Sequence, residues 1–493
     1  MSRPDLFEPL RDPFALRDAI AAEGSMDPEY SRGAAARIFA QWTRAQACYV
    51  EELKAWAAWD GRRWVMRADA VVFVAMHNFC TGLAAMAAAD DALGRGAATM
   101  ARSMVSDANV SGILRIAAAH MSTPLALFDA DAWLLNCNNG IIDLRTGELR
   151  AHDPAARCTK LSPVDYDAAA PIDESRFATF VREVFDGDDE LAAFVQASMG
   201  YCLTGDHAIH ALFFWFGSGR NGKNTLGDLL MHVMGDYARK IESRVLMRTV
   251  NDRHPTEIAQ LRGVRLAIAS EINKGAFWDE ARIKEMSGDA VLNARGIREN
   301  PFTFNRTHKH LIYGNNKPRL GEVDAAIKTR MKLVPFVVNF EERGVADPAL
   351  PERLLAEQHI ALRWAVEGAV RVWAAGRRLP DAAAVREATA EYLDENDVMK
   401  EWLAEQCFVS DETKDDGAPK VVTRSRVLYR NYSDWKKGRG EGAEAESNWR
   451  QMMRNAGFKT VLRGGVTCFA GVGLLFNPEE EVGGKVVPLK REG

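Results

Sequence analysis

Hydrophobic positions along the chain change their period in distinct blocks. Between residues 33 and 119 they recur with the spacing of helices, and a tryptophan-rich turn, KAWAAWDGRRW, interrupts the pattern. Residues 121–170 then show short apolar stretches between Asn-Gly and Thr-Gly turns, which is typical of a small β element. The first third of the chain is therefore predicted to contain a helical region, in which the tryptophans pack, followed by a small β-rich region. The alternative for the tryptophans is a stacking platform for bases.

The middle of the chain alternates helical spacing with short apolar runs. Residues 177–203 carry helical spacing and lead into the run 211–216, whose composition is that of a strand buried on both faces. Apolar residues return at helical spacing in 226–233. Three further apolar runs predict additional strands, at 265–270, at 310–314 and directly after Arg330. Strands that alternate with helices predict an α/β fold with a parallel sheet.

Helical spacing returns after Val338. The amphipathic segment 350–376 carries its apolar residues on one broad face, which predicts a helical closure of the α/β core. The last unit, 393–476, ends in two short strands around Gly464-Gly465. Before these strands it predicts three helices, at 398–407, 424–435 and 447–457. This order of elements suggests a winged helix.

Composition limits the classes of function. The 493 residues are 47% hydrophobic and 27% charged, as in ordinary globular proteins, and the length suggests three or four domains. The formal net charge of −5 argues against a protein coated in positive charge. Any nucleic-acid site must therefore be a local patch or channel.

Cysteine usage and the N-terminal composition predict a cytoplasmic protein. The seven cysteines are scattered and form no C-x-x-C pair, which favours free thiols in a reducing compartment over a zinc ribbon or a disulfide framework. The first residues, MSRPDLFEPLRDPF, place acids and prolines where a secretory signal needs an apolar core. The longest apolar segment, 70–88, is interrupted by His77 and Asn78, so we expect a packed helix and no membrane contact.

The glycine-rich turn after the run 211–216 carries the main chemical signal. It meets the pattern G-x-x-x-x-G-K, and its residues are, in order, Gly217, Ser218, Gly219, Arg220, Asn221, Gly222, Lys223, Asn224 and Thr225. Glycines leave room for an anion, backbone N–H groups at a helix start bind phosphate, and the lysine reaches the β- and γ-phosphates. The turn therefore predicts an ATP site.

Two residues compete as the Mg²⁺ ligand of this site. The pattern requires a hydroxyl directly after the lysine, but Asn224 stands there, and the first hydroxyl is that of Thr225. Either the Asn224 carboxamide oxygen ligates the metal, or Thr225 does so after a small shift of the helix start. We expect ATP and Mg²⁺ as cofactors in either case.

Polar residues at the ends of the further strands are candidates for the rest of the site. Glu271 follows the run 265–270, and open α/β sheets bind ligands at the carboxyl ends of their strands, so we assign it as the water-orienting base and a Mg²⁺ partner. Asn315 follows the run 310–314 and could hydrogen-bond the γ-phosphate or its water. Arg330 could reach the γ-phosphate of a neighbouring subunit as an arginine finger. The plainer alternatives are a surface glutamate and a turn that merely begins with asparagine.

Four motifs in order resemble a known family. They are HPTEIAQLRGVRLAIASE, IKEMSGDAVLNARGIRENPFTF, HLIYGNNKP and IKTRMKLVPF, and the upstream stretches NNGIIDLRTGELRAHDP and GYCLTGD look like the N-terminal region of the same family. This family is the superfamily III helicases of the phage and plasmid primase-helicase branch, which includes poxvirus-type enzymes. The resemblance covers roughly residues 40–475. It implies an ATP-driven hexamer that moves on single-stranded DNA, usually 3′ to 5′, at a replication origin or fork.

The resemblance also assigns roles residue by residue. By this resemblance Lys223 is the phosphate lysine and Glu271 is the catalytic acid. Asn315 is the sensor, and Arg330 is the finger that acts on a neighbouring subunit. Two positions depart from the family's pattern. Asn224 replaces the usual hydroxyl, and Ser270 stands where many members carry a second acid. These departures leave the metal ligation open.

DNA contacts are expected at two places. By resemblance, the segment 284–304 is the channel hairpin that grips the DNA backbone, with Lys284, Arg295 and Arg298 as its cations. A few cations per subunit, repeated around a ring, give a positive pore on an acidic protein. The alternative is a solvated hairpin with ordinary surface arginines. In the last unit, basic residues on helical faces could bind duplex DNA, namely Arg424, Arg426, Arg430, Lys436 and Lys437.

These expectations define a fold and its regions. The fold is an α/β P-loop (AAA+-like) ATPase core with a helical and small-β N-terminal region and a C-terminal winged-helix domain. A lead-in segment (1–34) is followed by a helical region (35–120) and a β-rich region (121–175). The helicase ATPase domain (176–392), the winged-helix-like domain (393–476) and a disordered tail (477–493) complete the chain.

The predicted function is an ATP-dependent DNA helicase for the replication of a phage, plasmid or mobile element, working as a hexameric ring on single-stranded or forked DNA. No zinc cluster or acidic triad of a primase is visible before residue 170, so priming is expected from a separate primase or initiator. One alternative is an ATP-switched replication initiator that melts an origin without processive unwinding. The other is a P-loop phosphotransferase that acts on a small molecule.

Overall fold

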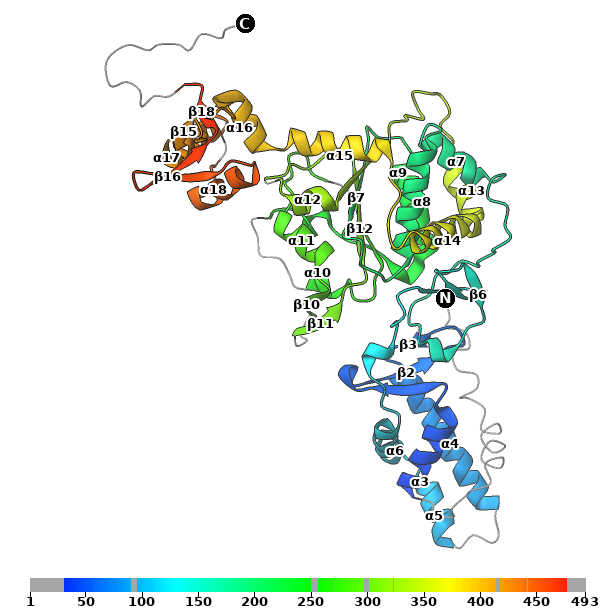
Figure 1. Ribbon diagram of the computed structural model, residues 1–493. Coiled ribbons are helices and arrows are strands. Elements are labelled where there is room, and N and C mark those ends of the chain that lie inside the picture. The colour runs from blue at the N-terminus through cyan, green and yellow to red at the C-terminus, as the bar shows by residue number, and fades with distance from the viewer. Residues whose placement is uncertain are drawn as a thin grey trace.

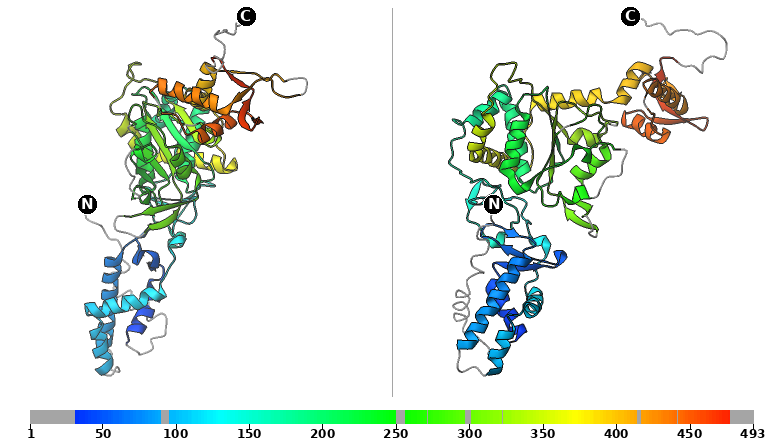
Figure 2. Two further views of the ribbon diagram at one scale, coloured as in Figure 1. Left: turned by 90° about the vertical axis from the view of Figure 1, so that its left-hand side faces the viewer. Right: turned by 180° about the vertical axis from the view of Figure 1, so that it is seen from behind.

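The computed structural model describes most of the chain and divides it into three parts (Figure 1). The described ranges are 31–89, 95–249, 256–270, 272–296, 301–321, 323–413, 417–440 and 442–476. An N-terminal helical unit projects from one side of a central α/β core, and a small C-terminal unit lies beyond α15 (Ala383–Glu395). Figure 2 shows the same three parts from two further directions.

The N-terminal unit combines helices with a small antiparallel sheet. Its elements are α3 (Arg32–Thr43), β1 (Ala47–Val50), β2 (Ala55–Trp59), β3 (Trp64–Val65), α4 (Asp69–Ala89), α5 (Arg95–Ser103) and α6 (Asp107–His120). Phe39 and Phe79 meet edge to face in its core, with ring centroids 5.6 Å apart. Trp56 and Trp64 are buried, so packing holds these tryptophans, as their sequence context predicted.

Helix α4 is long and apolar enough to cross a membrane if length and composition alone are considered. Its residues Val72, Met76, Phe79 and Leu83 are buried, however, in the hydrophobic core of the N-terminal unit. Because the core helix of a globular protein passes the same test, the length and composition of α4 are weak support for a membrane span.

The small β-rich region forms a three-stranded sheet of β4 (Leu134–Cys137), β5 (Gly140–Asp143) and β6 (Glu148–Arg150). Its Leu135 and Ile142 belong to the same hydrophobic cluster as the helices that follow. Arg265, buried at the start of a core strand, donates to the Leu134 carbonyl (2.8 Å) and to the Leu203 carbonyl (2.6 Å). The hydrophobic core therefore runs without a break across the boundary expected at residue 175.

Five parallel strands form the central sheet, in the spatial order β13, β7, β12, β9, β8. They are β7 (Leu212–Phe216), β8 (Ala238–Lys240), β9 (Leu266–Ala269), β12 (Lys309–Gly314) and β13 (Met331–Pro335). Phe213 and Trp215 pack on one face of the sheet, and Leu212 and Phe214 pack on the other, so β7 is buried on both faces. The predicted α/β fold with a parallel sheet is confirmed.

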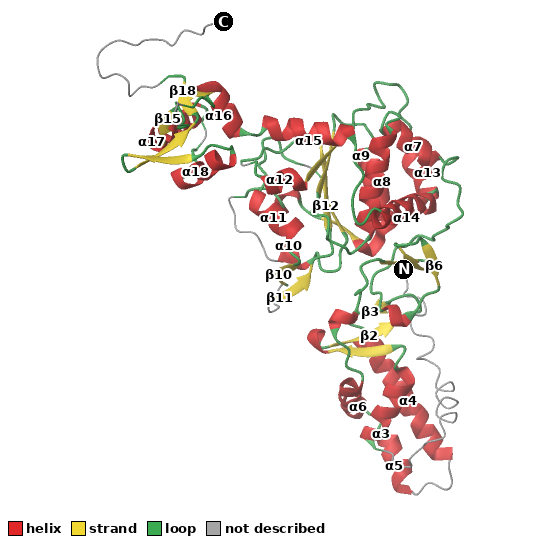
Figure 3. Ribbon diagram, in the orientation of Figure 1, coloured by secondary structure: helices red, strands yellow, loops and turns green. Residues whose placement is uncertain are grey.

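Helices cover both faces of this sheet (Figure 3). One face packs against α7 (Arg176–Val184), α8 (Asp189–Leu203), α9 (Lys223–Met234), α13 (Leu350–Ala356) and α14 (Gln358–Ala374), and the other packs against α10 (Thr256–Ala259), α11 (Glu280–Gly288) and α12 (Ala325–Arg330). Helices α8 and α14 cross with their backbones in contact, because a Cβ on Gly200 would lie only 2.1 Å from the Ala369 nitrogen. The predicted helical closure of the core is formed by α13 and α14.

A β-hairpin leaves the core between β9 and β12. Its strands β10 (Val291–Arg295) and β11 (Pro301–Asn305) pair antiparallel, as the sequence predicted. Because β11 leads into the first residue of β12, the hairpin projects from the edge of the sheet where the strands begin. We call this the amino edge. The opposite edge, where the strands end, is the carboxyl edge.

The C-terminal unit contains three helices and two small antiparallel sheets. The helices are α16 (Val398–Gln406), α17 (Ser425–Gly438) and α18 (Glu446–Asn455). One sheet has the order β15 (Val422–Arg424), β17 (Val466–Ala470), β16 (Thr460–Arg463), and the other pairs β14 (Cys407–Val409) with β18 (Val472–Leu474). Trp402, Tyr432, Trp449 and Phe469 are fully buried in its core. The helices and the two strands around Gly464-Gly465 lie where the sequence predicted them.

Candidate functional site

The predicted phosphate loop forms a tight turn between β7 and α9 at the carboxyl edge. Helix α9 begins at Lys223, and its N-cap Gly222 has a left-handed backbone (φ 82°). Gly219 also has a positive φ of 104°, which side chains of L-residues rarely allow. A Cβ on Gly217 would lie 2.2 Å from the Phe336 carbonyl oxygen. The turn therefore requires glycine at all three positions of the motif.

Lys223 is buried, and three oxygen atoms hold its ammonium. It donates to the Gly217 carbonyl (3.1 Å), to Asn221 Oδ1 (2.8 Å) and over a longer distance to Asn315 Oδ1 (3.4 Å). Burial lowers the pKa of this ammonium to about 8. Ser218 of the same loop is exposed. All three acceptors of the lysine are neutral, so an anion that entered the loop would be the stronger partner.

The segment after β13 braces the loop from outside. Asn221 donates to the Phe336 carbonyl (3.0 Å), and the Phe340 N–H donates to the Arg220 carbonyl (3.0 Å). The Arg220 guanidinium is ion-paired with Glu341. These contacts tie the phosphate loop to the end of β13, so the loop and the edge strand are coupled mechanically.

The predicted metal ligands lie beside the loop or outside the described residues. In the first turn of α9, Asn224 is exposed and Thr225 is half-buried. Glu271 lies outside the described residues, between Ser270 and Ile272. No cluster of three or more His, Cys, Asp or Glu side chains that could hold a metal occurs in the ranges that the structure describes. Mg²⁺ needs no such cluster, because it keeps several waters and shares the phosphate oxygens of its nucleotide, so these oxygen donors fit it.

The end of β12 brings a second strand to the loop. Asn315 faces Lys223 with its carboxamide oxygen, and its nitrogen lies 3.5 Å from the place that a Cβ on Gly219 would take. The next residue, Asn316, turns away and donates to the Ile272 carbonyl (3.3 Å). Of the two asparagines, it is Asn315 that lies at the phosphate loop.

Arg330 lies at the amino edge, at the opposite end of the sheet from the loop. It ends α12, and the strand that follows it begins opposite Leu212, the first residue of β7. From Leu212 to Phe216 a strand runs about 13 Å, at about 3.3 Å per residue. The Arg330 guanidinium donates to Ser287 Oγ (3.1 Å) and to the Ala326 carbonyl (3.0 Å). It therefore does not reach the phosphate loop of its own chain.

The three cations predicted on the hairpin have different surroundings. Lys284 belongs to α11 and is ion-paired with Asp324, the N-cap of α12. Arg295 is exposed at the end of β10. Arg298 lies outside the described residues. Lys284 thus joins two helices, whereas Arg295 occupies a surface position that a DNA backbone could reach.

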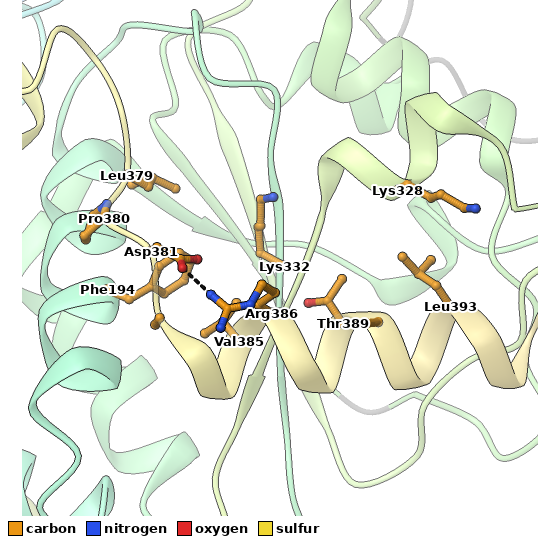
Figure 4. Close-up of a pocket in the computed structure, with 12 residues that line it drawn as sticks. Phe194, Lys328, Lys332, Leu379, Pro380, Asp381, Val385, Arg386, Thr389 and Leu393 are labelled. Carbon is orange, nitrogen blue, oxygen red and sulfur yellow. Dashed lines mark hydrogen bonds and ion pairs between the residues drawn. The ribbon is translucent and has the colours of Figure 1, made fainter.

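A pocket of about 430 Å³ lies elsewhere, against the edge strand β13 (Figure 4). Lys332 of β13 and Arg386 of α15 line it, and Arg386 is ion-paired with Asp381. Thr389 of α15 accepts a hydrogen bond from the Leu333 N–H (3.0 Å), so α15 closes this edge of the sheet. No residue of the phosphate loop lines the pocket. It is separate from the candidate nucleotide site.

Known families and proteins match parts of this chain. Residues 36–186 match the family "D5 N terminal like", and residues 215–330 match the "Family of unknown function (DUF5906)". "Putative helicase L207/L206" of Acanthamoeba polyphaga mimivirus is 22% identical over 336 residues, which cover 64% of this chain and 34% of the relative. "Putative helicase 022R" of Frog virus 3 (isolate Goorha) is 23% identical over 364 residues, which cover 57% of this chain and 37% of the relative. The matches thus span about a third of each relative's length.

The D5-type match and the two viral relatives point to the same family as the sequence motifs. The chain is a relative of the D5-type primase-helicases of superfamily III. This confirms the resemblance found in the sequence motifs. The apo C-terminal region of NrS-1 also aligns with 86% of this chain and 95% of its own, at 9% identity and a TM-score of 0.41, a likeness too low to support an argument.

The basic residues predicted to contact DNA in the C-terminal unit differ in their exposure to solvent. Four of the predicted DNA contacts are exposed, namely Arg424, Arg426, Arg430 and Lys437. Lys436 is only 6% exposed, and its Nζ lies 3.8 Å from Glu444 Oε1. Burial removes Lys436 from the surface that a nucleic acid could reach, and its ammonium faces Glu444 inside the unit.

Two features were not predicted from the sequence. The Tyr313 hydroxyl donates to the Asp228 carboxylate (3.5 Å) beside the phosphate loop. Asp228 follows Asn224 by four residues on α9, and this helical spacing was a signal that the sequence contained. The second feature is a set of buried cations at the amino edge, formed by Arg265, Arg306 and Lys309. The local pattern gives little signal for these cations, because most of their acceptors are backbone carbonyls of distant segments.

Proposed function

We propose that this protein is an ATP-dependent DNA helicase that unwinds DNA during the replication of a phage, plasmid or other mobile element. The observation that carries the proposal is the convergence of Lys223, Asn221 and Asn315 at the carboxyl edge of a parallel sheet. A lysine that opens a helix after a glycine turn, beside an asparagine from the neighbouring strand end, can bind a triphosphate and contact its γ-phosphate. The core is accordingly proposed to be a P-loop, AAA+-like ATPase.

ATP binding exchanges the partners of Lys223. Neutral oxygens hold the ammonium in the free protein, and phosphate oxygens take their place, together with the N–H groups of the loop. Asn224 or Thr225, with Glu271, would hold Mg²⁺, which supplies charge neutralisation on the β- and γ-phosphates. Glu271 orients the attacking water, and Asn315 hydrogen-bonds this water or the γ-phosphate. Hydrolysis then needs one more cation near the γ-phosphate.

The position of Arg330 supports a site that is shared between subunits. It lies about 13 Å along the sheet from the loop of its own chain, at about 3.3 Å per strand residue. From this position an arginine is too far from the nucleotide of its own chain but could act on that of a neighbour. We therefore propose a homo-oligomer, a hexameric ring by resemblance, in which Lys223 of one subunit and Arg330 of the next contact one triphosphate.

Two side-chain links join this arginine to the hairpin. Helix α11 runs directly into β10, and it is joined to α12 by the Lys284–Asp324 ion pair and by the Arg330–Ser287 hydrogen bond. A Cβ on Gly288 would lie 2.8 Å from Arg330 Nη2, so the arginine also packs against the segment that enters the hairpin. Movement of Arg330 on hydrolysis would thereby shift the hairpin and the DNA strand that it holds.

The C-terminal unit is proposed to be a winged helix that contacts duplex DNA. The order of three helices and the three-stranded antiparallel sheet support this fold. Exposed arginines on and beside α17 supply the phosphate contacts, namely Arg424, Arg426 and Arg430. Lys436 is excluded from the contact surface because it is buried.

Strand displacement by the purified chain tests the proposal. We expect ATP hydrolysis that single-stranded DNA stimulates, and displacement of a labelled strand from a fork, both of which Lys223→Ala abolishes. If the protein melts an origin but displaces no strand beyond it, the ATP-switched initiator is the better description. If DNA does not affect its ATPase activity and it phosphorylates a small acceptor, it is a phosphotransferase. Primer synthesis by the chain would contradict the need for a separate primase.

A further inference from the structure

Two positions of the candidate metal site depart from the residues that the motif leads one to expect. Asn224 replaces a hydroxyl at the start of α9, and Ser270, at the end of β9, replaces an acid. Both side chains are neutral. Mg²⁺ in phosphate sites is usually held through one or two carboxylates in addition to phosphate oxygens and water. Apart from Glu271, which lies outside the described residues, the expected positions offer no carboxylate.

Asp228 brings a carboxylate to this place from another direction. It lies four residues after Asn224 on α9, so the two side chains share one face of the helix. The Tyr313 hydroxyl donates to its Oδ1 at 3.5 Å. Tyr313 belongs to β12 and follows Ile312, which pairs with Ala269 of β9, so Tyr313 lies beside Ser270 at the end of the adjacent strand. The carboxylate thus stands next to the position that lacks an acid.

Few structural interactions account for a carboxylate at position 228. It is exposed, and no ion pair joins it to another residue that the structure describes. It lies beyond the first turn of α9, where a carboxylate no longer stabilises the helix N-terminus. Its side chain accepts one hydrogen bond within the described residues, from the hydroxyl of Tyr313, whose buried ring stacks on Trp215. A purely structural role would therefore be to satisfy this hydroxyl.

We propose that Asp228 replaces the acid missing at position 270 and holds the water shell of the Mg²⁺ that accompanies ATP, with Tyr313 orienting its carboxylate. The proposal rests on the nucleotide site proposed above. A carboxylate set back on the helix reaches the ion through the waters that Mg²⁺ retains. Such outer-shell groups typically change metal affinity 10- to 100-fold when they are removed.

Nucleotide binding at varied Mg²⁺ tests this assignment without measuring turnover. A ribose-labelled fluorescent ATP analogue is titrated with the full chain in EDTA and at increasing Mg²⁺. For Asp228→Asn we expect the Mg²⁺ concentration at half-maximal binding to rise about tenfold, while affinity in EDTA stays the same. Adding Ser270→Asp to Asp228→Asn should restore the wild-type Mg²⁺ dependence. Asp107→Asn, an equal loss of charge in the N-terminal unit, should change nothing.

Three results would overturn the assignment. One is an unchanged Mg²⁺ dependence in Asp228→Asn. Another is an equal loss of affinity with and without Mg²⁺, together with a lowered melting temperature that Tyr313→Phe reproduces, since this marks Asp228 as a partner of the hydroxyl only. The third is a folded Asp228→Asn/Ser270→Asp variant that fails to recover. If the wild type itself binds no ATP, the proposed function fails instead, so the two failures are distinct.

Discussion

Two buried lysines lie at opposite edges of the same sheet. Lys309, at the amino edge, is 1% exposed and donates to the backbone carbonyls of Asp206 (3.3 Å), Thr307 (3.2 Å) and Thr204. Lys223, at the carboxyl edge, is 3% exposed and donates to one carbonyl and two asparagine side chains. Burial lowers the pKa of both ammonium groups, to about 7 and about 8 respectively.

The difference between the two lysines lies in their acceptors. Carbonyls are fixed by the backbone, whereas asparagine side chains can rotate away when a phosphate arrives. The other buried cations of the amino edge follow Lys309, since Arg265 and Arg306 also donate to backbone carbonyls. Burial and a lowered pKa therefore do not identify a ligand-binding lysine. The two lysines differ instead in their acceptors, because two of the three acceptors of Lys223 are side chains.

The largest expected effect is the loss of ATPase activity when Arg330, at the amino edge, is removed. Arg330 sits at the amino edge, yet it is proposed to act at the carboxyl edge of a neighbour. Arg330→Ala should lower ATPase activity about 10³-fold, because an arginine finger is worth at least that much. Mixing it with Lys223→Ala should restore part of the activity, since some interfaces then combine an intact lysine with an intact arginine. No recovery in a steady-state ATPase assay of mixed oligomers would mean that the site lies within one chain.

A matched pair of substitutions separates the two lysines directly. Lys223→Met should lower ATPase activity at least about 100-fold, because the phosphate loses its lysine partner. Its loss of stability should be smaller than that of Lys309→Met, because two of the three acceptors that lose a donor are asparagine side chains, which can turn to other partners. Lys309→Met should lower the free energy of unfolding by about 3 kcal/mol, because three buried carbonyls lose their donor. Urea denaturation followed by circular dichroism, alongside the ATPase assay, checks both. Equal loss of stability in the two variants would remove the distinction.

The pH dependence of ATP binding sharpens the comparison. The pKa of the Lys223 ammonium is about 8 in the free protein, and bound phosphate raises it. Above pH 8 the free lysine loses its proton while the complex keeps it, so the Kd for ATP should rise by up to about tenfold per pH unit. Lys223→Arg keeps its charge and should bind ATP with a flat profile over this range. Fluorescence titration between pH 7 and pH 9.5 measures both, and parallel profiles would contradict the proposal.

The smallest effect concerns the link from Arg330 to the hairpin. Ser287→Ala removes the Oγ that accepts from Arg330 Nε at 3.1 Å. We expect ATPase activity within about twofold of wild type and a few-fold fewer base pairs unwound per ATP, since a single hydrogen bond contributes about 1 kcal/mol. Thr329→Ala, an exposed hydroxyl on α12, serves as the control. If unwinding and hydrolysis fall together, Ser287 acts on catalysis and not on coupling.

Much of the fold and part of the site could be predicted because they are local in sequence. The strand, glycine turn and helix around Lys223 follow one another within a few residues, and positive φ values at Gly219 and Gly222 need no distant partner. The hairpin and the three helices of the C-terminal unit are local in the same way. Glu271 and Arg298 lie outside the described residues and stay predictions.

Side-chain partners were decided by the tertiary structure alone. Lys284 was expected on the DNA surface, but α12 brings Asp324, 40 positions away, to its ammonium. Lys436 has the same charge as Lys437 in the sequence, and only the tertiary packing of the unit buries it, beside Glu444. A sequence gives the number of charges and their spacing along one element. Which of them face solvent, and which meet a partner, depends on the segments that the fold brings together, because burial and electrostatic pairing act through space.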